Sequence, residues 1–79
     1  MSKTLITADS EYNQIMLQDA LLAFDAGNDG AVTMSVEVSK GDFVTVESTP
    51  IGSFVQRGTW CNAIVKFEIT GDGILAIYQ

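Results

Sequence analysis

The chain has 79 residues, a formal net charge of −6 at pH 7 and no histidine. A chain of this length buries only about 60% of the surface that its unfolded form exposes, so we expect one domain over residues 1–79 with a thin core. Its single cysteine, Cys61, excludes an intrachain disulfide, and without histidine the chain cannot supply a tetrahedral Cys/His zinc site. Additional stability is therefore expected from self-association or from docking on a larger assembly.

The acidic composition argues against nucleic acid and against anionic membranes as partners. Both require clustered basic side chains, whereas the four basic residues are scattered along the chain: Lys3, Lys40, Arg57 and Lys66. The first residues contain no apolar run of signal-peptide length, and no stretch approaches the roughly 18 apolar residues of a membrane span. We expect synthesis in the cytoplasm, where a single free cysteine suits the reducing environment.

The amino-terminal third is the ambiguous part of the chain. A short β-prone run, Thr4 to Thr7, is followed by a polar turn at residues 9–13. Residues 14–24 (QIMLQDALLAF) fit either an amphipathic helix or a pair of strands. Asn13 could cap a helix, but Met16 stands where a capping box requires Glu or Gln. We favour strands, because the remainder of the chain alternates as β structure does, and a short helix within 14–24 is the alternative.

The middle of the chain reads as strands separated by strong turns. Residues 25–30 (DAGNDG) tolerate the positive φ of tight turns, and Ala31 to Val38 then alternates as a half-buried strand. A turn at residues 39–42 leads into a strand over Phe43–Ser48, which ends at Thr49-Pro50 because proline lacks the ladder donor. Residues 51–56 form a weaker, edge-type strand, and residues 57–59 (Arg-Gly-Thr) make the next turn.

The last residues, WCNAIVKFEITGDGILAIYQ, predict a β-hairpin. Two alternating runs are joined by Gly71-Asp72-Gly73, and Val65, Phe67 and Ile69 share the core face of the first run. The second run is still apolar where the chain ends, so we expect its last residues to be paired in a sheet. Turns at intervals of about ten residues predict an all-β fold, a small antiparallel β-sandwich or barrel of about six to eight short strands.

The residue types leave little material for catalysis. Without histidine there is no Ser-His-Asp or Cys-His arrangement, so an enzyme would need acidic pairs such as Asp9 with Glu11, or Asp29 with Asp42. Acids in turns and on solvated strand faces are explained without catalysis, and so thin a domain lacks the walls of a deep pocket. We predict that the chain is not an enzyme and has no cofactor and no small-molecule substrate.

Two other chemical signals have structural explanations. Asp25 to Gly30 resembles the opening of a calcium loop, but Gly27 replaces the third-position ligand and Val36 replaces the bidentate Glu. We interpret the segment as a turn and predict no metal site. A reactive thiol needs an electropositive setting, and Cys61 has only Arg57 nearby, so we expect an inert, buried small hydrophobe.

Arg57 and Trp60 are the candidate interface residues. Both types are enriched at binding hot spots, and the two residues flank one predicted turn. For Trp60 the other interpretation is a core or corner residue at the start of a strand.

The order of elements from Ala31 onward resembles that of a known group of proteins. The strand GAVTMSVEVS precedes a closing AIVKFEITGDGILAIYQ, and the two segments are similar to two patterns of one protein group, G-x-x-T-V-x-V-S and x-V-R-F-x-V-T-G-x-G. These patterns resemble the small β-sandwich proteins encoded among the virion genes of tailed bacteriophages. The corresponding residues are Gly30, Val32, Thr33, Val36, Val38 and Ser39, followed by Val65, Lys66, Phe67, Ile69, Thr70, Gly71 and Gly73.

The resemblance implies a non-enzymatic structural protein of a phage virion. Proteins of that group are capsid decoration (cement) proteins, head fibres or tail-associated parts, and they bind a capsid or tail lattice, often as trimers. The implied partners are copies of the chain and a phage capsid or tail protein, and the implied location is the virion. The alternative hypothesis is a small acidic inhibitory or regulatory protein-binding module of a mobile element. Such a mimic needs rows of carboxylates, whereas the ten acids here are spread over nearly every turn.

Overall fold

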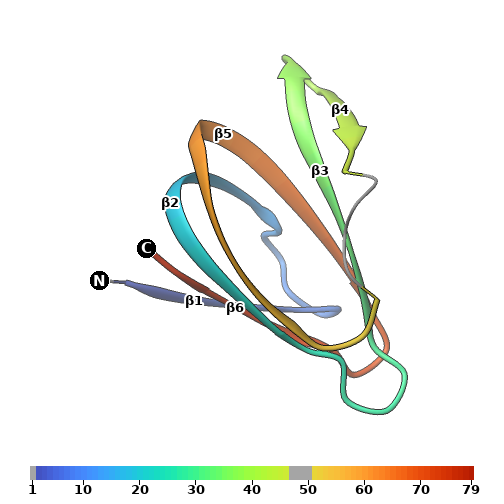
Figure 1. Ribbon diagram of the computed structural model, residues 1–79. Helices are drawn as coiled ribbons and strands as arrows, with labels where there is room; N and C mark the ends of the chain where they lie inside the picture. Colours follow the sequence, from blue (N-terminus) through green and yellow to red (C-terminus); the bar gives the residue numbers. More distant parts are fainter. Residues whose placement is uncertain (1, 47–50) are drawn as a thin grey trace.

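A computed structural model describes residues 2–46 and 51–79 of the chain (Figure 1). The fold is all-β, as the sequence predicts, and the strands are antiparallel members of one six-stranded sheet in the order β1-β6-β2-β5-β3-β4. The strands are β1 (Lys3–Thr7), β2 (Gln14–Asp25), β3 (Ala31–Ser39), β4 (Asp42–Thr45), β5 (Phe54–Thr70) and β6 (Ile74–Tyr78).

Two long strands, β2 and β5, bend and fold the sheet over on itself (Figure 1). Residues 19–24 of β2 pair with 54–59 of β5, and residues 14–17 pair with 63–66. Between these stretches, Gln18 faces residues 60–62, where Cys61 and Asn62 have positive φ values of 53° and 64°. An irregularity of this kind bends a strand without ending it.

The bend produces two layers that share β2 and β5. The first layer contains β1, β6, the second half of β2 and the first half of β5. The second layer contains the first half of β2, the second half of β5, β3 and β4. The core lies between the layers, and the predicted core residues Val65, Phe67 and Ile69 are buried. The buried hydrophobic side chains are Ile6, Leu17, Ala20, Leu22, Phe24, Val32, Met34, Val65, Phe67, Ile69, Leu75 and Ile77.

Residues 14–24 form strand rather than helix, so the favoured interpretation is correct. They form one continuous strand, however, and not the pair that we expected. Leu22 and Phe24 are buried and alternate with exposed or half-buried neighbours. Leu17 and Ala20, on either side of the bend at Gln18, both keep their side chains in the core. Pairing on both edges of the second half of β2, with β5 and β6, supplies backbone bonds that a local helix would otherwise provide.

The predicted turn at residues 57–59 is wrong. Residues 54–59 pair with β2, and β5 then runs on through the bend to Thr70. Gly58 leaves room for the indole of Trp60, because a Cβ atom on Gly58 would stand 3.2 Å from Trp60 Nε1. The predicted strand end at Thr49-Pro50 lies outside the described residues.

Candidate interaction surface

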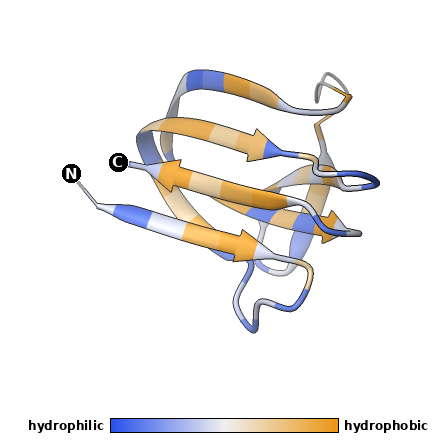
Figure 2. Cartoon of the chain, turned by 90° about the horizontal axis from the view of Figure 1, so that it is seen from below, coloured by the Kyte–Doolittle hydropathy of each residue, from blue (hydrophilic) through white to orange (hydrophobic). Residues whose placement is uncertain are grey.

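The outward face of the first layer is apolar and exposed. Strand alternation places three rows of side chains across β1, β6, β2 and β5 on this surface, which we call the outer face. Figure 2 shows these four strands side by side, each with a hydrophobic stretch. The middle row is the most apolar of the three. The end row is Lys3, Tyr78, Leu21 and Arg57; the middle row is Leu5, Ala76, Ala23 and Val55; the opposite end row contains Thr7, Ile74 and Asp25.

Consecutive apolar residues in the strand sequences create this surface. A strand with one solvated face alternates apolar and polar residues, but β2 contains ALLAF and β6 contains ILAIY, so both faces of these strands carry apolar side chains. Val55 is 71% exposed, Leu5 56% and Ile74 44%. A shallow groove of about 270 Å³ crosses the same region, lined by Ala23, Phe24, Asp25, Phe54, Val55, Ile74 and Ala76.

Charges at the two ends of the outer face have opposite sign. Lys3 and Arg57 stand in one end row, and the Lys3 ammonium lies 5.7 Å from the centroid of the Tyr78 ring. Asp25 stands in the other end row and is exposed. Its Oδ1 accepts a hydrogen bond of 2.9 Å from the Gly27 amide, which holds the carboxylate at that end. The surface is therefore an apolar strip with a positive end and a negative end.

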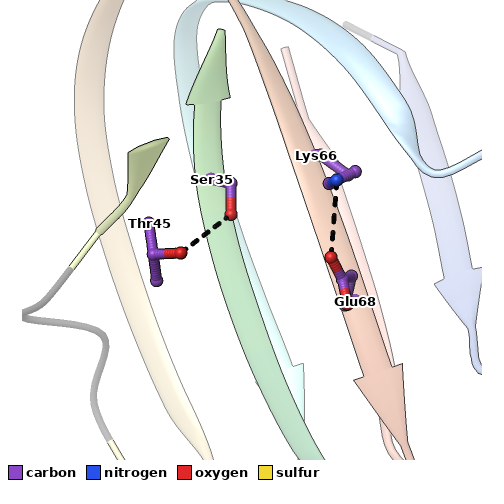
Figure 3. Close-up of polar contacts among 4 residues, drawn as sticks. All are labelled: Ser35, Thr45, Lys66 and Glu68. Atoms are coloured by element: carbon purple, nitrogen blue, oxygen red, sulfur yellow. Dashed lines mark hydrogen bonds and ion pairs between the residues drawn. The ribbon is translucent and has the colours of Figure 1, made fainter. Parts of the chain in front are cut away.

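The outward face of the second layer is polar by comparison. Lys66 and Glu68 form an ion pair of 3.5 Å, and the Ser35 and Thr45 hydroxyls lie 3.5 Å apart (Figure 3). The Lys66 ammonium also lies 4.6 Å from the centroid of the Phe43 ring, which covers part of that ring's apolar face. Of the two outward faces, the first layer's has the character of a protein contact.

The two predicted interface residues lie on opposite faces of β5. Arg57 is exposed and belongs to the outer face, in register with Leu21. Trp60 is half-buried, packs against the core, and has a buried Nε1 with no hydrogen-bond partner among the described residues. No turn joins the two residues, since β5 is continuous through them. Sequence reasoning missed Leu5, Val55 and Ile74. The available signal was that each of them stands next to a second apolar residue in its strand, Ile6, Phe54 and Leu75 respectively.

The segment resembling a calcium loop has its carboxylates engaged by backbone amides. The Asp72 carboxylate accepts hydrogen bonds from the amides of Asn28 (3.1 Å) and Asp29 (3.2 Å), and Asp29 Oδ1 accepts one from the Asp72 amide (3.2 Å). These bonds, the one from Asn28 above all, lower the pKa of Asp72. Gly27 permits this approach, because a Cβ atom there would stand 2.6 Å from Asp72 Oδ1. Within residues 2–46 and 51–79, no three His, Cys, Asp or Glu side chains are grouped as metal ligands.

Cys61 is exposed at the bend of β5, contrary to the expected burial. Its position opposite Gln18, where the pairing between β2 and β5 shifts, turns it out of the core. The described parts of the chain also contain no helix long and apolar enough to cross a membrane.

No protein-family model matches the chain, and no curated protein or solved structure is significantly similar to it.

Proposed function

We propose that the chain is a non-enzymatic structural protein of a phage virion, which attaches to other protein surfaces through the outer face of its first layer. The observation that carries the attachment is the exposed apolar strip around Leu5, Val55 and Ile74 with charges at its two ends. The virion assignment is supported by the resemblance of residues 30–79 to small phage virion proteins.

The size of the outer face agrees with a contact surface. Four neighbouring strand segments spaced about 4.8 Å apart, each about five residues long at roughly 3.3 Å per residue, cover on the order of 300 Å² in projection. The largest apolar patch on a typical monomer is about 300–600 Å² and is often functional, so the outer face, whose end rows also carry charged side chains, is at the lower end of that range. Burying apolar surface against a partner stabilises the complex by about 25 cal/mol per Å² removed from water. The surface is available for this because a domain of this size leaves much of its apolar surface exposed.

Virions from the strain that encodes the chain provide the test. Particles purified on a density gradient should contain the chain, detected by mass spectrometry. Val55→Asp places a charge in the middle row of the outer face and should remove the chain from the particles. Gln14→Asp is the matched control, because Gln14 is an exposed strand residue in register with Lys66, away from the outer face.

Two results would overturn the proposal. One is absence of the wild-type chain from purified particles, and the other is normal incorporation of Val55→Asp. Stoichiometric capture of one basic host enzyme, combined with absence from particles, would instead support the inhibitory module.

A further inference from the structure

We infer that the partner of the outer face is a second copy of this chain, packed face to face so that the Arg57 end of one copy meets the Asp25 end of the other. This inference names the partner of the surface on which the proposed function rests.

The register of the strands defines the packing. A two-fold axis along the middle row, Leu5-Ala76-Ala23-Val55, places each end row of one copy over the opposite end row of the other. Tyr78 then lies opposite the second copy's Ile74, and Leu21 lies opposite the second copy's Asp25. Sheets packed in this way are about 10 Å apart, and the small side chains of Ala23 and Ala76 at the centre allow that approach.

Charge selects this orientation. Arg57 is one strand away from Leu21, about 5 Å, so its long side chain can reach the second copy's Asp25. The symmetry creates two such Arg57–Asp25 pairs in one dimer. A two-fold axis along the strands would instead bring Lys3 of one copy against Arg57 of the other, which like-charge repulsion disfavours.

The net charge also favours this face for self-association. Two copies of a chain with a charge of −6 repel each other, and approach is easiest where positive side chains are concentrated. Two of the four basic residues, Lys3 and Arg57, stand in one row of the outer face. Because about 300 Å² per copy is below the roughly 800 Å² of a standard interface, the dimer is weak in isolation.

Paired charge reversals test the packing. Arg57→Asp and Asp25→Arg each make both cross-pairs repulsive, so each variant alone should self-associate at least about tenfold more weakly than wild type in sedimentation equilibrium up to about 1 mM. A mixture of the two variants should form a heterodimer with an affinity within about threefold of wild type, because both of its cross-pairs are attractive.

Circular dichroism checks folding, and Asp25→Asn keeps an acceptor for the Gly27 amide if Asp25→Arg fails to fold. Asp25→Asn removes the charge without reversing it, so mixing it with Arg57→Asp removes both repulsive pairs and should restore association above that of Arg57→Asp alone.

The outcomes separate this inference from the proposed function. Rescue in the mixture supports the antiparallel dimer. A wild-type chain that stays monomeric at 1 mM, or variants that associate as wild type does, overturns it. If the chain is monomeric but Val55→Asp still removes it from virions, the proposed function stands and the partner of the outer face is another protein.

Discussion

Ile77 provides the sharpest test of how the closing strand stabilises the fold. Its side chain is 1% exposed, and its backbone is in register with Thr4 of β1 and Leu22 of β2. Shortening a buried isoleucine to alanine typically costs about 2–5 kcal/mol. A domain of this length has a total free energy of unfolding of about 4–12 kcal/mol, at roughly 0.05–0.15 kcal/mol per residue. Ile77→Ala should therefore remain folded but lose a large fraction of its stability.

Deleting residues 77–79 removes more than one side chain. Gln79 forms two backbone hydrogen bonds with Ser2, and its side chain bonds the Gln18 amide and the Met16 carbonyl (each 3.3 Å). Those side-chain bonds lie beside the irregularity in the pairing of β2 with β5. The Ser2 hydroxyl also donates to the Gln79 carbonyl (3.3 Å). The loss of these five bonds, at about 1 kcal/mol each, and of the Ile77 side chain approaches the whole stability of the domain.

Urea denaturation followed by circular dichroism measures both effects. We expect a lower midpoint for Ile77→Ala at an unchanged slope, and no cooperative transition for the deletion. Glu68→Ala, at a side chain 60% exposed on the other layer, is the control and should keep a near wild-type midpoint. A deletion variant that unfolds cooperatively at the wild-type midpoint would refute the role assigned to the closing strand.

Three further predictions concern the loops and the bend. The lowered pKa of Asp72 contributes stability that is present above its ordinary value of 3.8 and is lost as the pH falls through the lower folded-state value. Asp72→Asn should therefore lower the thermal midpoint more at pH 7 than at pH 2, and an equal loss at both pH values contradicts this. Gly71→Ala should lower the free energy of unfolding, measured by urea denaturation, more than Gly41→Ala does. Both glycines have positive φ, but only a Cβ atom at Gly71 would meet another residue, at 2.5 Å from Asp29 Oδ1. Equal losses of stability would show that backbone strain alone matters. Trp60→Ala should lower the free energy of unfolding by about 2 kcal/mol, because the half-buried Trp60 packs on the core. Self-association of the folded variant should be unchanged. Weaker association at unchanged stability would make Trp60 an interface residue.

Local patterns in the sequence predicted the parts of the fold that local forces specify. The alternation of Val65, Phe67 and Ile69 identified the buried face of β5, and the turn residues at 25–30 and 71–73 marked the loops correctly. Alternation and turn chemistry act between residues that are close in sequence, so they can be read without knowledge of the partner strands.

The long strands and the outer face were not predicted, because they depend on distant pairings. Gly58 suggested a turn, but β2 holds residues 54–59 in a strand, and β5 bends later, at Cys61 and Asn62. Arg57 was selected for its residue type, and its neighbours on the outer face come from three other strands.

Local residue order is enough to specify β structure in this protein, the turn of its closing hairpin and the side chains of that hairpin that enter the core. The sharing of β2 and β5 between two layers, and the row formed by Leu5, Ala76, Ala23 and Val55, depend on how distant segments pair. A strand's side-chain alternation is a local property, whereas the neighbours on its face are set by register between segments far apart in the chain.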